Sequence, residues 1–326
     1  MSGQDTTPGA LAAALVEALP DRSFSDVRPL GQGWDFNALL VDGTWVFRVP
    51  RKPEFEPELI REIDLMARIA RRLPVPVPEY AFGPLRAAAL PFAFGGYPFL
   101  DGIPLVDLEP TPERRAAVAR QLGDCMAVLH AIPTADLEGL PDTSYADKSD
   151  LLDFRARVKR FLPAVSGHLA PETAERARRF FEDEIRIPEP FAGSPVLRHT
   201  DVHCGHLLLR SETDATVSGV IDWSDASLGD PAGDLAELVP WASADFLDEL
   251  LACYPGASRG IRERAHFIAT VVTFAEIAWL ADVGYDHVAA RMAVVVDELL
   301  SAYVERSRSD PAHGPRPRLP PCTHGW

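Results

Sequence analysis

Residues 197–223 hold the residue types that metal-assisted and acid–base chemistry needs, at a spacing that brings them together. Two short apolar segments flank a polar turn at 211–216, and this pattern predicts a β-hairpin. Paired positions of a hairpin keep a constant sum, so we expect His206 opposite Asp222. Asp201 lies in the loop just before the hairpin. Two carboxylates and an imidazole would then meet at one point, which suits a divalent cation and a general base.

The segments upstream predict a β-rich region with one main helix. Residues 26–50 alternate in hydrophobicity as three antiparallel strands, with a glycine-containing loop at 31–36 after the first. Asp42-Gly43 is the signal of a type I′ hairpin turn. Apolar residues repeat at steps of three and four over 57–73, which predicts an amphipathic helix. The prolines at 74–78 then predict an extended connector.

The chain downstream becomes helical, beginning at Thr111-Pro112-Glu113, a sequence typical of a helix start. Short strands within 195–235 interrupt the helices, which resume from 242 to about 306. We therefore predict an α+β fold with two lobes. The expected parts are an N-terminal lobe at 1–97, a hinge at 98–103, a helical lobe at 104–308, and a disordered Pro- and Gly-rich tail at 309–326.

Composition and charge exclude several classes of protein. The 326 residues are 47% hydrophobic and 25% charged, as in globular proteins with a substantial core. The net charge of −16 argues against a general nucleic-acid or anionic-membrane binder, because phosphates attract Lys and Arg. Glu276 interrupts the most apolar helical stretch, and no basic segment opens the chain, so we expect a cytoplasmic protein without a membrane span. Four cysteines without a C-x-x-C pair predict neither a zinc ribbon nor a disulfide framework.

The motifs around the predicted hairpin resemble those of the aminoglycoside-phosphotransferase-like kinases, the small-molecule branch of the protein-kinase-like fold. The resemblance covers about residues 25–305 and rests on His199-x-Asp201-x-x-x-x-His206, on Ile221-Asp222-Trp223 and on Gly229-Asp-Pro-Ala-Gly-Asp234. Most members carry Asn at the position of His206. Histidine there is similar to the macrolide phosphotransferase subgroup, as is Gly33-Trp-Asp-Phe-Asn37 running into Trp45-Val-Phe-Arg-Val-Pro-Arg51. The resemblance implies a protein-kinase-like two-lobe fold.

The resemblance also implies a role for each matching residue. Asp201 resembles the catalytic base that receives the proton of the attacking hydroxyl. His206 and Asp222 resemble the metal ligands, although Mg²⁺ prefers oxygen to imidazole nitrogen. His199 and Asp234 would brace the catalytic loop. The residues expected to bind the nucleotide are Gly31, Gly33, Arg48, Glu62, Pro98 and Leu100. Arg48 stands where most kinases carry Lys, and its guanidinium can also hold phosphate.

The acceptor is expected to bind on and after the apolar helix around residue 276. Macrolides are large apolar rings with an amino sugar, so they need apolar walls and an acidic group. The candidates are Phe274, Glu276, Trp279, Leu280 and Tyr285. The implied reaction is transfer of the γ-phosphate of GTP, with ATP as a possible donor, to the 2′-hydroxyl of a macrolide such as erythromycin, with Mg²⁺. We expect an antibiotic-inactivating monomer that binds neither nucleic acid nor membrane.

Other functions stay open at the level of sequence. The same kinase chemistry suits an aminoglycoside, a homoserine-like metabolite or a sugar as the acceptor. A zinc hydrolase that uses His199, Asp201, His203 and His206 would leave the glycine loop, Arg48 and Glu62 without a purpose. A nucleotide-binding module without catalysis is disfavoured, because both Asp201 and Asp222 are present.

Overall fold

The computed structural model describes residues 6–137, 139–140, 155, 158–160, 162–182, 188–189, 191–240, 244–258 and 260–308. The chain packs as two compact units. The first comprises Met1–Pro104 and His206–Ala226, and the second comprises Leu105–Gly205 and Ser227–Trp326. The predicted disordered tail at 309–326 lies outside the described residues.

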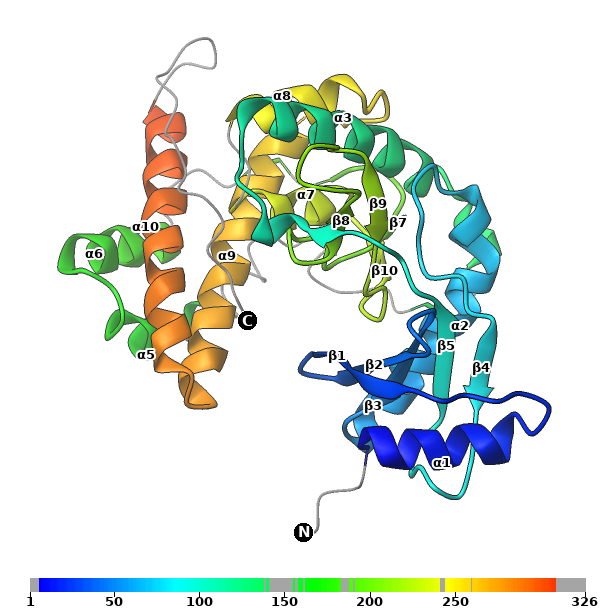
Figure 1. Ribbon diagram of the computed structural model, residues 1–326. Coiled ribbons are helices and arrows are strands. Elements are labelled where there is room, and N and C mark those ends of the chain that lie inside the picture. Colours follow the sequence, from blue (N-terminus) through cyan, green and yellow to red (C-terminus); the bar gives the residue numbers. More distant parts are fainter. Residues whose placement is uncertain are drawn as a thin grey trace. The chain divides into compact units, whose positions relative to one another are not determined.

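The first unit is built on a five-stranded antiparallel sheet with the strand order β1-β2-β3-β5-β4 (Figure 1). Its strands are β1 (Val27–Gln32), β2 (Phe36–Val41), β3 (Trp45–Pro50), β4 (Phe82–Leu85) and β5 (Phe94–Pro98). The meander β1-β2-β3 confirms the predicted three strands. Its second turn has φ values of 50° at Asp42 and 65° at Gly43, as a type I′ turn requires.

Helices α1 (Pro8–Ala18) and α2 (Glu56–Ile69) pack on opposite faces of this sheet. Successive side chains of a strand point to opposite faces. On β2, Leu39 and Val41 therefore join a core cluster with α1. Phe36, on the other face of the same strand, packs with Leu59 and Ile63 of α2. The sequence predicted α2, and this alternation explains how one strand contributes to two hydrophobic layers.

The predicted hairpin belongs to the first unit. Strand β8 (Leu207–Leu209) pairs with β6 (Ile103–Pro104) and with β9 (Val217–Val220), all antiparallel. The backbone N–H of Val220 also donates to the carbonyl of Pro76 at 2.9 Å. These contacts explain why His206–Ala226 packs with the N-terminal segment, although the sequence pattern placed it inside the helical lobe at 104–308.

The second unit is mostly helical, with one two-stranded ribbon of β7 (Val196–Arg198) and β10 (Ser227–Gly229). Its helices are α3 (Pro112–Leu129), α5 (Leu162–Ser166), α6 (Pro171–Phe181), α7 (Ala232–Leu238), α8 (Ala244–Ala252), α9 (Ile261–Asp282) and α10 (Asp286–Arg308). Thr111 caps α3 by accepting the N–H of Arg114 at 3.2 Å, as its sequence predicted. The α+β class is confirmed.

Helix α9 is long and apolar enough to cross a membrane by length and composition alone. However, 67% of its most apolar stretch is buried inside the protein. It packs against α7 and α10 in the second unit (Figure 1). Core packing therefore accounts for its apolar character.

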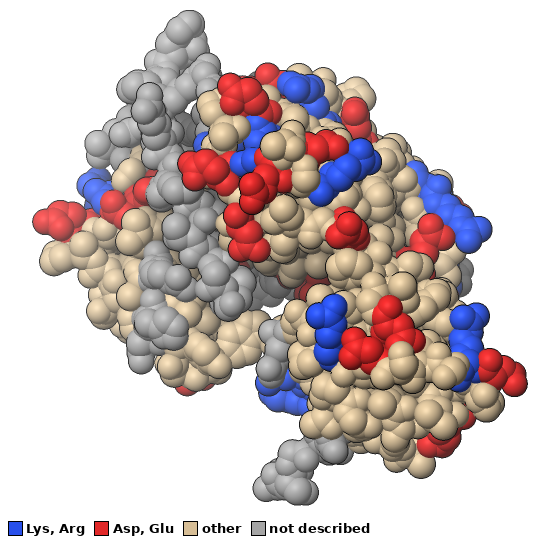
Figure 2. All heavy atoms as spheres, in the orientation of Figure 1, with Lys and Arg blue, Asp and Glu red and all other residues tan. Residues whose placement is uncertain are grey.

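The surface reflects the acidic composition. On the face drawn in Figure 2, Lys and Arg are interspersed with Asp and Glu and with uncharged surface. No broad basic patch covers the described part of this face, in keeping with 48 acidic against 32 basic residues in the sequence.

Candidate functional site

A buried arginine joins two carboxylates in the first unit. Arg48 lies on β3 with only 5% of its surface exposed. Its Nη1 donates to both carboxylate oxygens of Glu62, at 2.8 and 2.6 Å, and its Nη2 donates to Asp222 Oδ1 at 2.6 Å. The guanidinium carbon also lies 4.3 Å from the ring centroid of Phe36. Arg48 thus pairs with Glu62 and with Asp222 at once, and the direct contact with Asp222 is one that the sequence did not indicate.

The two carboxylates respond differently to this environment. Burial raises the pKa of Glu62, and Arg48 opposes that rise. Burial alone would raise the pKa of Asp222 as well, but Arg48 and His206 outweigh it and hold that pKa well below its usual range. Asp222 therefore stays ionised near neutral pH, the state that a cation ligand needs.

The hairpin register differs from the prediction by one residue. Leu207 pairs with Val220, and the N–H of Ile221 donates to the carbonyl of His206 at 3.0 Å. His206 therefore faces Ile221 rather than Asp222. The turn at 211–216 and the pairs Leu207–Val220 and Leu208–Gly219 share one centre, which places residue 221 opposite residue 206, so the prediction was wrong by one position.

Asp222 nevertheless reaches His206. Its backbone adopts a φ of 65° directly after the hairpin, a left-handed conformation that Asp tolerates better than most residues. Asp222 Oδ2 then lies 3.6 Å from His206 Nε2, and Ser224 Oγ donates to Oδ1 at 3.0 Å. Since Arg48 and Ser224 both contact Oδ1, Oδ2 and His206 Nε2 form the donor pair that fits a divalent cation.

The glycine loop between β1 and β2 is held by an arginine. Arg51 Nη1 donates to the carbonyl oxygens of Gly33, at 2.7 Å, and Trp34, at 3.1 Å. A Cβ on Gly31 would meet nothing within 4 Å, and one on Gly33 would meet only the Phe36 carbonyl at 3.7 Å. The fold itself does not require glycine at either position, so the bare backbone suits the close approach of a ligand.

The expected base-binding residues lie at the end of β5. Pro98 is exposed and pairs with Trp45 across the sheet, and Leu100 is half-buried two residues later.

In the second unit, Asp201 lies in the loop after β7 and is braced by a buried aspartate. Asp234, in the first turn of α7, accepts the backbone N–H of His199 at 3.1 Å and of Thr200 at 2.8 Å. His199 is only 1% exposed, and its Nδ1 accepts the N–H of Asp201 at 3.2 Å. Thr200 has a φ of 77°, a strained conformation for a β-branched residue. His199 and Asp234 thus both contact the backbone of the loop that holds Asp201.

The brace extends to two residues that the sequence did not single out. His130 Nε2 lies 3.0 Å from Asp234 Oδ2, and His130 Nδ1 lies 2.8 Å from the Tyr254 hydroxyl. Burial alone would raise the pKa of Asp234, but the hydrogen bond from His130 and the charge of Arg198 lower it overall. His130 and Tyr254 belong to no recognisable sequence motif, so only the fold shows that they contribute to this support.

Arg198 provides a second support for the same loop. Its buried guanidinium donates from Nη2 to Ser227 Oγ at 3.0 Å, and Ser227 Oγ lies 2.8 Å from Thr200 Oγ1. A Cβ on Gly233 would collide with Nη1 of Arg198. The glycine before Asp234 therefore makes room for the arginine under the loop.

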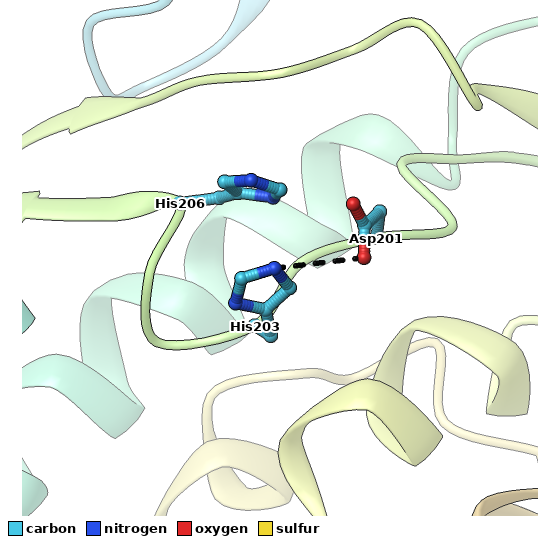
Figure 3. A group of neighbouring side chains, drawn as sticks. All are labelled: Asp201, His203 and His206. Atoms are coloured by element: carbon cyan, nitrogen blue, oxygen red, sulfur yellow. Dashed lines mark ion pairs between the residues drawn. The ribbon is translucent and has the colours of Figure 1, made fainter. Parts of the chain in front are cut away.

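The side chain of Asp201 is 34% exposed and faces a histidine (Figure 3). His203 Nε2 lies 3.7 Å from Asp201 Oδ1, and His203 Nδ1 accepts the N–H of Gly205 at 3.0 Å. Backbone N–H groups engage Nδ1 of both His199 and His203, so each ring meets its other neighbours through Nε2.

Two of the five expected pocket residues are core residues instead. Phe274 is fully buried with its ring centroid 5.0 Å from that of Phe181, and Leu280 is 2% exposed. Helix α9 buries residues on almost every side, so its sequence does not distinguish a pocket wall from the core.

The other three candidates are accessible. Trp279 and Tyr285 are 45% and 40% exposed, and Glu276 is half-buried. Burial raises the pKa of Glu276 to about 7. Burial also raises the pKa of Glu237 on α7, with Glu276 and Asp201 adding to the rise. Glu237 therefore lies within electrostatic reach of both Glu276 and Asp201 in the second unit.

Comparisons with known proteins favour a phosphotransferase and give the zinc-hydrolase alternative no support. The model of a phosphotransferase enzyme family, APH, matches residues 26–267. The uncharacterized protein YcbJ of Bacillus subtilis (strain 168) is 26% identical over 227 residues, 62% of this chain and 66% of that protein, so the match spans just under two thirds of the relative.

Solved structures share the fold. The GDP complex of aminoglycoside 2′-phosphotransferase-IIIa superposes with a TM-score of 0.76 at 22% identity, covering 91% of this chain and 99% of that one. Macrolide 2′-phosphotransferase MphH from Brachybacterium faecium gives 0.61 at 22% identity, covering 89% and 97%. The expected kinase-like fold is confirmed, and both kinds of acceptor occur among proteins that share it.

Proposed function

This chain belongs to the phosphotransferase enzyme family, and from that premise we propose that it transfers the γ-phosphate of GTP to the 2′-hydroxyl of the amino sugar of a macrolide antibiotic. Such a transfer inactivates the antibiotic. The observation that carries the proposal is the buried Arg48, joined to both Glu62 and the ionised Asp222. This arrangement supplies a fixed cation for phosphate and a carboxylate for a metal ion.

The chain's own residues account for the parts of phosphoryl transfer. The loop at Gly31 and Gly33 offers bare backbone to the phosphates, and Arg48 offers its guanidinium. Asp222 and His206 would hold Mg²⁺, which supplies positive charge to the phosphate oxygens. Asp201 accepts the proton of the acceptor hydroxyl while the oxygen of that hydroxyl forms a bond to the γ-phosphorus. The bond from that phosphorus to the β–γ bridging oxygen breaks, and the nucleoside diphosphate leaves.

A guanine nucleotide is the proposed donor, and ATP is the alternative. The carbonyl of Pro98 and the N–H of Leu100 would contact the base. The solved relative with a TM-score of 0.76 is a GDP complex, which supports the choice of donor. Because the donor is a nucleoside triphosphate, we also place the protein in the cytoplasm, acting as a monomer on a small molecule.

Glu276, Trp279 and Tyr285 support a macrolide as the acceptor. One half-buried carboxylate and two exposed aromatic rings suit an apolar ligand with a single ammonium group. The second carboxylate at Glu237 favours an aminoglycoside as the other candidate, because such a ligand carries several ammonium groups. Either acceptor presents a hydroxyl to Asp201.

The test incubates the protein and Mg²⁺ with erythromycin or kanamycin, each with GTP or ATP, and measures the product mass. A gain of one phosphate on erythromycin with GTP supports the proposal. A gain on kanamycin alone favours the second candidate, and no gain on either refutes both acceptors. Asp201→Asn is the matched control. It should lose about 10²- to 10⁴-fold in transfer rate, as removal of a general base does, and should bind the nucleotide normally.

A further inference from the structure

His203 has a hydrogen-bond pattern that determines which of its nitrogens carries the proton. The N–H of Gly205 donates to His203 Nδ1 at 3.0 Å, so Nδ1 presents a lone pair. A neutral imidazole carries one proton, which must then lie on Nε2. Nε2 faces Asp201 Oδ1 at 3.7 Å. His203 therefore presents an N–H, and not a lone pair, to the catalytic carboxylate (Figure 3).

The absence of a side chain at Gly205 leaves room for the His203 ring. A Cβ at Gly205 would lie 2.8 Å from His203 Cε1 and 3.1 Å from Nδ1, closer than real side chains allow. The imidazole thus packs directly against the Cα of Gly205, and its Nδ1 accepts the N–H of the same residue. The side chain of His203 is 29% exposed, so this backbone contact fixes its orientation where packing is incomplete.

The same pattern excludes other roles for His203 in the reaction. Its Nδ1 lone pair is engaged by the Gly205 amide, and its Nε2 already carries a proton. His203 can therefore neither take the acceptor's proton nor relay it from Asp201 without first breaking this arrangement. What it can do is hold one carboxylate oxygen by donating to it.

We propose that His203 is a positioning residue for Asp201: its Nε2–H holds Oδ1 so that Oδ2 faces the acceptor hydroxyl. The inference rests on the proposed phosphotransferase function. At 3.7 Å the contact is longer than a hydrogen bond, and it shortens when the acceptor engages Oδ2, as catalytic hydrogen bonds do on substrate binding. The acceptor's proton moves to Oδ2 as the oxygen–phosphorus bond forms, and His203 keeps its own proton throughout.

Three substitutions at this position separate the role from a merely structural one. His203→Ala should lower kcat by about 10- to 100-fold, the effect of misplacing a catalytic group, with the KM for nucleotide changed less than about twofold. His203→Gln should recover most of kcat, because its amide nitrogen reaches the place of Nε2. His203→Asn has a shorter side chain and should not recover it. An unchanged kcat in His203→Ala, or equal recovery by Asn and Gln, overturns the proposal.

A double substitution tests whether His203 acts through Asp201. In an Asp201→Asn background, adding His203→Ala should change the residual rate by less than about twofold, because the two effects are not additive. A further loss as large as in the wild-type background overturns the proposal. Gly205→Ala should mimic His203→Ala in kcat, since the added methyl displaces the ring and leaves the imidazole itself intact.

A spectroscopic experiment tests the contact between His203 and Asp201 even if none of the tested acceptors is phosphorylated. Nitrogen-15 NMR of histidine-labelled protein, without nucleotide or acceptor, should show His203 with an unprotonated Nδ1 and a protonated Nε2. Asp201→Asn should shift the His203 Nε2 signal more than that of the buried His130. A protonated Nδ1, or a His203 signal insensitive to Asp201→Asn, overturns the proposal whatever the outcome of the acceptor panel.

Discussion

Removal of the Arg48 guanidinium should increase local unfolding of the first unit far more than removal of an exposed arginine does. Arg48→Ala deletes three charge-assisted contacts and leaves Glu62, whose side chain is fully buried, without its cation. Asp222 is 33% exposed, so water can compensate it in part. Leaving one buried charge unpaired costs about 3–5 kcal/mol. At 1.36 kcal/mol per factor of ten, a cost of about 4 kcal/mol corresponds to roughly a thousandfold more opening.

Amide hydrogen exchange read by mass spectrometry measures this opening locally. Peptides covering β3 and α2 should exchange about a thousandfold faster in Arg48→Ala than in the wild type. Arg71→Ala is the matched control, since the Arg71 side chain is 89% exposed and pairs only at the surface with Glu79. Its effect should stay below about fivefold.

A compensating pair of substitutions tests the cause. In the combination Arg48→Met with Glu62→Leu, exchange should return most of the way to the wild-type rate, because two apolar side chains replace a buried ion pair at little cost. If Arg48→Ala exchanges within tenfold of the wild type, or if adding Glu62→Leu to Arg48→Met brings no recovery, the reasoning is refuted.

Three further predictions concern single positions. Burial raises the folded-state pKa of Glu276 from 4.5 to about 7, so the folded state holds a proton that the unfolded state releases, and wild-type stability should fall as pH rises through that range. Glu276→Gln should therefore be more stable than the wild type at pH 8, by up to about 3 kcal/mol, and not at pH 4.5, as measured by urea unfolding. Gly233→Ala, which drives a methyl into the buried Arg198, should lower stability by about 1–3 kcal/mol; an unchanged midpoint would contradict this packing. Gly31→Ala should leave the melting temperature unchanged and weaken nucleotide binding in a fluorescence titration, whereas normal affinity would show that the phosphates do not approach this glycine.

The local features of the fold were predictable because neighbouring residues carry their signals. Asp42-Gly43 specifies its turn through two positive φ values. Thr111 specifies a helix start through its own side chain. Glu62 carries no such local signal, and the fold sets its buried position on α2 beside Arg48.

The contacts that complete the site join residues far apart in sequence. Arg48 and Asp222 are separated by 174 positions, and His130 and Asp234 by 104. The one-residue error in the hairpin did not come from the irregularity between Leu208 and Leu209, because the turn at 211–216 already places His206 opposite Ile221. Composition likewise did not separate buried Phe274 from exposed Trp279, since apolar residues cover nearly the whole of α9.

The first unit is discontinuous in sequence, and this has a consequence for its synthesis. Strand β6 ends at Pro104, and its partner strand β8 is synthesised only with the segment His206–Ala226. At about 5–20 residues per second, a ribosome needs roughly 6–25 s to add residues 105–226. During this interval Arg48 and Glu62 can already form their ion pair, but Asp222 does not yet exist. Until β8 is synthesised, β6 has no strand to pair with, and a chaperone that binds exposed strands can bind it during this interval.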